Sequence, residues 1–403
     1  MARRLCAAAL GVCATLLACA TGTALATAVN AADRERLDRT ARYLQDAQNA
    51  DGGFSVRVGG PSEPGASAWV ALGLAAAGVN PQEQTPLSGG HSVYTYLQEH
   101  AQALSSTTAF ARELLVVDAA GAAPEDFGGV HLVEEILSRQ LEGPGSTGAF
   151  AEEAHSSAPS VNGTIFAILA LSPIDEEHAA KAVQQAAQWL LTVHNAGAGW
   201  PSHEVCPSHA SPGGCESNTD MTGAAIEALN AAGLERQPVQ EEAFEYLRQY
   251  AQSPNGGFSQ QAEEAEPNVA STAWVLQGIW SAAENPEAWP WLTEAAGDPM
   301  SYLASMQQED GHIRYDASEE DNGVWMTAQV APAYAGQPFP IPAVPLKAEP
   351  NQPPASSDSA APGPAGAEAG DGGESAYPGP GVISAGGGDG ASLFSRPQPQ
   401  SQG

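Results

Sequence analysis

Basic residues are scarce in this chain. Its 403 residues contain 15 Lys and Arg against 47 Asp and Glu, which gives a formal net charge of -32, and its lysines are Lys181 and Lys347. Nucleic acids and anionic membranes are bound through clustered Lys and Arg, so the shortage excludes both as partners. Such a large negative charge usually keeps a protein soluble, and it would also repel anionic substrates.

Long apolar runs are also missing after the N-terminus. No stretch beyond residue 31 approaches the roughly 20 apolar residues that a membrane-spanning helix needs, so no membrane span is predicted. Residues 1–31 instead combine Arg3-Arg4, an apolar run and small residues, which is typical of a signal peptide. Leu16-Leu17-Ala18-Cys19 resembles a lipidation box, but a better small-residue cleavage site lies downstream. We expect a secreted, extracellular protein, with lipid or cell-wall attachment left open.

Cysteine is rare, and three of the five cysteines precede residue 20. The remaining pair, Cys206 and Cys215, is expected to form a disulfide outside the cytosol. His203 and His209 lie among them, so a tetrahedral zinc site is the alternative for these four side chains. The disulfide is favoured because exported thiols oxidise, and neither a metal nor another cofactor is predicted.

The C-terminal part has a different composition from the rest. From residue 341 to residue 403 the chain loses its apolar period and fills with Pro, Gly, Ser and Ala. Such a segment cannot bury enough surface to offset its chain entropy, so a disordered tail is predicted. The expected organisation is a signal peptide at 1–31, one helical domain at 32–340 and the tail at 341–403.

One motif recurs within the predicted domain. Asp51-Gly52-Gly53-Phe54 precedes the apolar run Ala66–Val70, and Asn255-Gly256-Gly257-Phe258 precedes Ala270–Val275. A glycine turn, an aromatic residue and a small-residue helix cannot bury themselves alone, so the recurrence predicts stacked copies.

Six helix pairs can be laid along the chain. Their first helices are amphipathic and should lie outside, whereas their second helices are apolar all round and should lie in an inner ring. First helices are predicted at 37–49, 94–103, 132–141, 183–193, 241–251 and 300–307, and second helices at 66–77, 109–120, 162–171, 221–232, 268–283 and 323–334. The prediction is an all-α fold, an (α/α)6 toroid.

The segment Gln48–Phe54 resembles the repeat motif of proteins with prenyltransferase and squalene-oxidase repeats, and Gln308-Glu309-Asp310-Gly311 is similar. This family is related to terpenoid cyclases and to protein prenyltransferase beta subunits. The resemblance covers residues 37–335, and it implies an alpha-alpha toroid while specifying activity poorly.

Polar residues at the starts of the inner helices are the first candidate site. The inner helices should run parallel, so their N-termini gather at one mouth, where these residues either cap the helices or surround a ligand. They are Glu63, Asn162, Asn218, Asp220, Asn268, Asp321 and Asn322.

Asp220 resembles the central acid of the terpenoid cyclase motif Asp-x-Asp-Asp-Thr. The chain keeps this acid and Thr222, but Asn218 and Met221 replace the flanking acids. Flanking carboxyls help to set the protonation of the central acid, so their loss counts against cyclase chemistry. A zinc-dependent prenyltransferase is also disfavoured, because no Asp-x-Cys occurs.

Three tryptophans, Trp69, Trp274 and Trp325, are predicted to occupy equivalent places at the starts of inner helices. They serve either as core residues between helix layers or as the wall of an apolar ligand pocket.

The leading hypothesis is an exported, non-catalytic protein that binds an apolar or cobalamin-like small molecule, by fold-level analogy with cobalamin carriers. Its expected partners are the small molecule and a membrane transporter, and the oligomeric state is left open. The alternative is a terpenoid cyclase-like, prenyltransferase-like or polysaccharide-acting enzyme, with Asp220 as the acid. An interaction scaffold is the third hypothesis, should side chains fill the ring.

Overall fold

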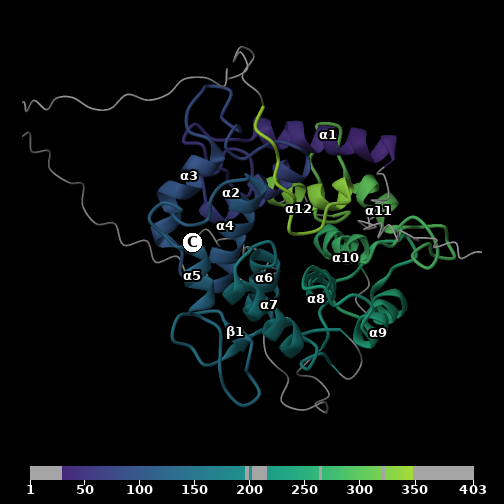
Figure 1. Ribbon diagram of the computed structural model, residues 1–403. Coiled ribbons are helices and arrows are strands. Elements are labelled where there is room, and N and C mark those ends of the chain that lie inside the picture. The colour runs from purple at the N-terminus through teal and green to yellow at the C-terminus, as the bar shows by residue number, and fades with distance from the viewer. Residues whose placement is uncertain (1–29, 196–198, 202–215, 263–265, 319–322, 348–403) are drawn as a thin grey trace, which may run out of the picture.

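The computed structural model describes residues 30–195, 199–201, 216–262, 266–318 and 323–347 (Figure 1). The predicted signal peptide lies outside these residues apart from its last two positions. Cys206, Cys215 and the two neighbouring histidines also lie outside them, as do Asp321, Asn322 and the chain from residue 348. The export, disulfide and tail assignments for these residues therefore stay predictions.

The described residues form twelve α-helices that alternate between an outer and an inner ring. The outer helices are α1 (Ala31–Asp46), α3 (Val93–His100), α5 (Leu132–Leu137), α7 (Glu177–Leu190), α9 (Pro238–Tyr246) and α11 (Pro299–Met306). The inner helices are α2 (Pro64–Ala76), α4 (Thr107–Ala119), α6 (Val161–Leu171), α8 (Thr219–Ala231), α10 (Val269–Ser281) and α12 (Gly323–Ala335). Short elements complete the set: η1 (Ala101–Ala103), η2 (Leu247–Ala251) and the antiparallel strands β1 (Phe150–Ala151) and β2 (Pro159–Ser160).

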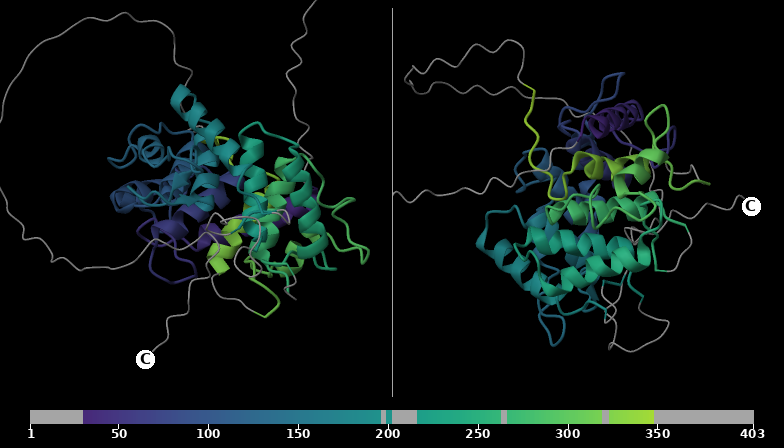
Figure 2. Two further views of the ribbon diagram at one scale, coloured as in Figure 1. Left: turned by 90° about the horizontal axis from the view of Figure 1, so that it is seen from below. Right: turned by 90° about the vertical axis from the view of Figure 1, so that its right-hand side faces the viewer.

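The inner helices close into a ring. Each packs against the next inner helix in chain order, and α12 packs against α2 (Figure 1). Figure 2 shows the helices of the two rings from two further sides. Helix α2 buries every residue from Ala66 to Ala76, whereas α7 buries one face and exposes the other. The predicted all-α toroid of six helical hairpins is confirmed.

Four glycine turns lie against the backbone of a neighbouring copy. Gly256 has φ +91° and lies against the backbone of Asp298, at the start of α11, so a Cβ at Gly256 would overlap it. Gly311 lies in the same way against Arg39 of α1. The turn glycines of five copies share φ values from 86° to 99°: Gly52, Gly148, Gly199, Gly256 and Gly311. Glycine is needed here for both its backbone conformation and its missing side chain.

In five copies a buried hydroxyl on the inner helix binds the backbone of the apolar residue that follows the glycine turn. The hydroxyl of Thr272 accepts the backbone N–H of Phe258 at 2.9 Å and donates to the carbonyl of Asn268 at 2.8 Å. The same acceptor role recurs in five copies, in Ser67, Thr164, Thr222, Thr272 and Thr327. These bonds hold the loops that connect outer and inner helices.

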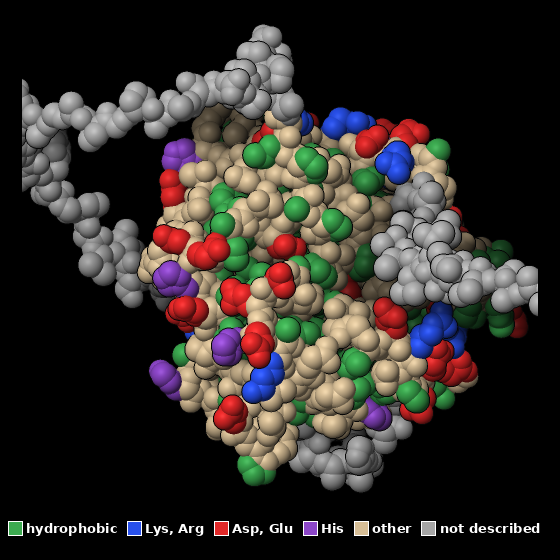
Figure 3. All heavy atoms as spheres, in the orientation of Figure 1, with side chains coloured by type: hydrophobic (Ala, Val, Ile, Leu, Met, Phe, Trp, Pro, Cys, Tyr) green, Lys and Arg blue, Asp and Glu red, His purple; other side chains and the backbone are tan. Residues whose placement is uncertain are grey.

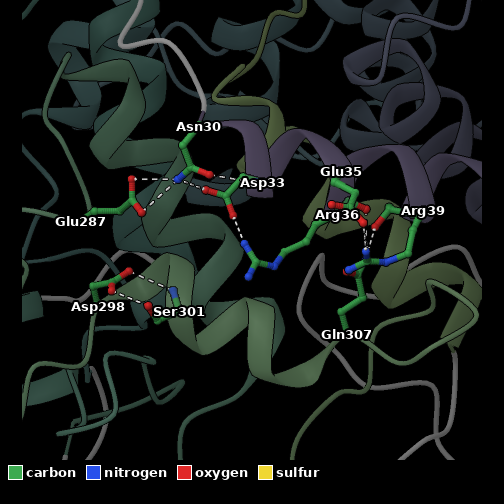
Figure 4. Close-up of polar contacts among 10 residues, drawn as sticks. Asn30, Asp33, Glu35, Arg36, Arg39, Glu287, Asp298, Ser301 and Gln307 are labelled. Atoms are coloured by element: carbon green, nitrogen blue, oxygen red, sulfur yellow. Dashed lines mark hydrogen bonds and ion pairs between the residues drawn. The ribbon is translucent and has the colours of Figure 1, made fainter.

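The seam between the last and first copies is a polar network (Figure 4). Gln307 donates to the carbonyl of Arg36 at 2.9 Å and to the hydroxyl of Thr40 at 3.0 Å. Arg39 donates back to the side-chain oxygen of Gln307 at 2.7 Å. Helix α1 is thereby tied to the chain that follows α11, which closes the outer ring.

Residues 336–347, named here the C-terminal strap, cross the end of the ring where the inner helices finish. Val344 donates its N–H to the carbonyl of Ala119 at 2.9 Å, and Asn80 donates to the carbonyl of Val344 at 2.6 Å. Phe339 and Ile341 are buried. The sequence assigns residue 341 onward to a disordered tail, but residues 341–347 pack on the domain because Ile341 and Val344 supply contacts that the Pro-rich composition obscures.

Candidate functional site

Four aromatic rings meet at the axis of the toroid and are named here the aromatic cluster: Trp69, Phe166, Trp274 and Phe339. Trp69, Phe166 and Trp274 come from α2, α6 and α10, and their ring centroids lie 6.0 to 6.1 Å apart in edge-to-face pairs. Phe339 enters from the C-terminal strap, 6.2 Å from the Trp69 ring and 6.1 Å from the Trp274 ring. Aromatic side chains thus fill this level of the ring.

The three ring-borne members share one position in the repeat. Each lies two residues after the buried hydroxyl of its own inner helix, as Trp69 follows Ser67. In α12 the same position holds Gln329, two residues after Thr327. Gln329 therefore places an amide at the repeat position that an aromatic residue occupies in α2, α6 and α10.

Gln329 belongs to a buried polar set with Glu227 and Gln277, which come from the neighbouring helices α12, α8 and α10. None of the three is more than 3 % exposed. Glu227 Oε1 accepts the N–H of Phe339, which places this carboxyl beside the aromatic cluster. Among the described residues, Glu227 Oε2, Gln277 Oε1 and both polar atoms of the Gln329 amide have no hydrogen-bond partner. Leaving such a group unsatisfied costs about 1–3 kcal/mol, so the buried polar set lowers the stability of the fold if nothing else binds these atoms.

Burial also changes the acidity of this set. Desolvation raises the pKa of Glu227 to about 8, and the hydrogen bond from Phe339 opposes the rise. Burial raises the pKa of Glu113 on α4 to about 8 in the same way, with the Arg112 charge opposing it. At neutral pH both carboxyls are therefore mainly protonated and uncharged, so Glu227 can donate as well as accept.

Two of the predicted polar residues are helix caps. Asn218 accepts the N–H of Met221 at 2.9 Å, and Asn268 accepts the N–H of Ser271 at 2.8 Å. Thr222 is the buried hydroxyl of its copy and accepts the N–H of Trp200. The repeat alone therefore explains Asn218 and Thr222, two positions of the cyclase-like motif.

Asn162 and Asp220 have a different role from the caps. Asn162 lies inside α6, whose cap is Ser160, and it donates to the hydroxyl of Thr108 at 3.1 Å. Asn162 is therefore not the cap of α6, because Ser160 supplies the cap oxygen. Asp220 occupies the matching position in α8, two residues after its cap, and is 1 % exposed. The Asn162–Thr108 hydrogen bond shows that the first turns of α6 and α4 lie at the same end of the ring.

Two further predictions need correction. Glu63 occupies the N-cap position of α2 but makes no capping hydrogen bond with its side chain. Trp325 is not equivalent to Trp69 and Trp274, because it lies two residues before the buried hydroxyl of its helix rather than two after it. It is half-buried and lies one turn away from the aromatic cluster. The sequence interpretation missed Phe166, which the spacing from Thr164 could have revealed.

The described residues contain no group of three or more His, Cys, Asp or Glu side chains placed to hold a metal ion. None of their helices combines the length and apolar character of a membrane-spanning segment. Asp and Glu side chains are spread over the face seen in Figure 3, where Lys and Arg are few.

Comparison with known protein families matches this architecture. The prenyltransferase alpha-alpha toroid domain matches residues 3–85 and 221–334, and the squalene-hopene cyclase C-terminal domain matches residues 157–266. The matched residues thus carry prenyltransferase alpha-alpha toroid and squalene-hopene cyclase C-terminal domains, as the repeat motifs predict. No curated protein sequence matches it.

Solved structures similar to this chain include a mannanase variant and a terpene cyclase. An inactive variant of alpha-1,6-mannanase GH76A of Salegentibacter sp. HEL1_6, in complex with alpha-1,6-mannotriose, is 12% identical with a TM-score of 0.53, over 75% of this chain and 99% of that one. The type II terpene cyclase MstE from Scytonema is 14% identical with a TM-score of 0.49, over 75% and 97% of the two chains. At such identities the mannanase likeness shows the fold alone.

Proposed function

We propose that this protein is an exported binding protein that holds an uncharged, largely apolar small molecule between its inner helices, next to the buried polar set. The observation that carries the proposal is the buried polar set, because Gln277 and Gln329 have unsatisfied atoms within otherwise apolar inner helices, and Glu227 of the same set accepts the N–H of Phe339. A few convergent polar groups on an apolar wall are the usual composition of a small-molecule site.

The surroundings define the ligand further. The aromatic cluster favours flat or polycyclic apolar groups, while the two amides and the protonated Glu227 offer both donors and acceptors. The C-terminal strap covers one end of the ring, so we expect a ligand to enter at the other end, where Asn162 and Asp220 lie in the first turns of α6 and α8. The net charge of -32 disfavours an anionic ligand.

Replacing both amides, Gln277→Leu with Gln329→Leu, is expected to abolish ligand retention without lowering stability. An apolar side chain of similar size removes unsatisfied polar atoms, so stability should stay equal or rise by about 1–3 kcal/mol. Native mass spectrometry of protein isolated from its source measures retention, and chemical denaturation measures stability.

The matched control is Gln188→Leu, an exposed position on α7, which should change neither quantity. Binding is contradicted if the wild-type protein carries no small molecule, or if the double variant retains as much as the wild type. A large loss of stability would instead mean that protein groups already satisfy these amides.

The second candidate is an enzyme that protonates an apolar substrate, with Asp220 as the acid. It is favoured by the burial of Asp220 on the helix that also carries Glu227, together with aromatic rings able to stabilise a cation. Asp220→Asn should then abolish conversion of isoprenoid substrates while leaving their binding unchanged. If the wild-type protein converts none of them, or if Asp220→Asn converts them as fast, this candidate fails.

A further inference from the structure

A second site lies outside the ring, where exposed apolar side chains gather. Trp289 is 85 % exposed and Leu292 is 40 % exposed, and both line a hollow of about 920 Å³. Tyr250, 56 % exposed, belongs to η2, which also supplies Arg248 to this hollow. Tryptophan is mostly buried in folded proteins, and exposed apolar side chains grouped in a concave place mark binding surfaces.

The element that forms one wall is itself unusual. The π-helical turn η2 continues α9 and places Arg248 over the ring of the buried Trp291, at 5.2 Å from its centroid. Such turns are rare and occur frequently at functional sites. On the other wall, Thr293 donates to the carbonyl of Pro254 at 2.8 Å, which fixes the segment that carries Trp289 and Leu292.

The charges of the lining exclude anionic ligands. Arg248 is paired with Glu245 at 2.7 Å, so its charge is already compensated, and Glu294 adds a second carboxylate. The remaining described lining groups include amides and hydroxyls. Thr293, Gln252 and Gln249 already donate within the protein, but their side-chain oxygens can still accept hydrogen bonds from neutral hydroxyls, while the exposed indole offers a flat apolar face.

The size of the hollow favours a small-ligand occupant over a protein. Its volume falls within the usual range of small-molecule sites, about 300–1,000 Å³. A stable protein interface needs about 20–30 residues on each side, more than this lining provides. A sugar has an apolar C–H face and a rim of hydroxyls, which match the indole and the polar lining respectively.

We infer that the hollow beside Trp289 binds a neutral carbohydrate chain, with a sugar ring stacked on the Trp289 indole and its hydroxyls bonded to the polar lining. This site is independent of the axial ligand and lies on the outer side of the toroid. Electrophoresis of the native protein in gels containing dextran, mannan or xylan tests it, with alginate as the anionic comparison. The wild-type protein should be retarded in at least one neutral gel and not in alginate.

Trp289→Ala should weaken that binding at least tenfold, and Trp289→Phe should retain part of it. Because Trp289 is mostly exposed, the thermal midpoint of both variants should match that of the wild type. Leu87→Ala is the matched control, since Leu87 is 90 % exposed and lies outside the hollow. The inference is overturned by no retardation in any neutral gel, by equal retardation of Trp289→Ala, or by retardation in alginate alone. A concentration-dependent dimer that Trp289→Ala abolishes would assign the hollow to a second copy of the chain instead.

Discussion

Gly256→Ala is expected to destabilise the domain by roughly 3–5 kcal/mol, because two separate penalties coincide at this turn. The residue has φ +91°, where an alanine is strained, and the new Cβ would overlap the backbone of Asp298 at the start of α11. A backbone group cannot turn aside as a flexible side chain can. The contact between this copy and the next would therefore open, and chemical denaturation should record the loss.

Gly233→Ala separates the two penalties. Gly233 has φ +74° with nothing within 4 Å of a built Cβ, so only the backbone strain applies and the cost should be about 1–2 kcal/mol. Equal losses in the two variants would contradict the close contact between copies. They would then reflect backbone conformation alone.

Phe339→Ala is expected to cost roughly 3–4 kcal/mol, as for other buried phenylalanines. The side chain is 3 % exposed and touches both Trp69 and Trp274, while its N–H satisfies one oxygen of Glu227. Its removal leaves a cavity at the axis and weakens the attachment of the C-terminal strap. Thermal and chemical unfolding measure the loss.

Leu346→Ala provides the comparison within the same strap. Leu346 is 56 % exposed, so its replacement should change stability by less than about 0.5 kcal/mol. If Phe339→Ala were equally mild, the strap would not be docked in the ring. The assignment of Phe339 to the aromatic cluster would then be wrong.

Much of the fold could be predicted because the repeated motif has the same physical requirements wherever it occurs. The turn at Gly52 and the turn at Gly256 need the same φ, and the small residues that follow must be covered on both sides. The pairing of α12 with α2 could be inferred from six copies, since an open array leaves two bare ends. The docking of the strap could not be predicted, because it depends on Phe339 and on Ile341, and residue 341 begins the segment whose composition predicts a disordered tail.

The candidate site was only partly predictable. Asn218 and Asn268 could be identified as polar candidates, but their side-chain oxygens cap α8 and α10. Gln277 and Gln329 did not stand out, because an amide within an apolar helix gains meaning only when its neighbours are known to offer it no partner. Trp325 was misassigned because the position within the repeat is set by the buried hydroxyl, here Thr327, whose role only the structure shows.

A crystal structure of the protein isolated from its own source tests the central claim most directly. We expect electron density for a bound organic molecule within hydrogen-bond distance of the Gln277 and Gln329 side chains and in contact with the Trp274 ring. Density for protein or water alone around these amides would contradict the proposed binding function.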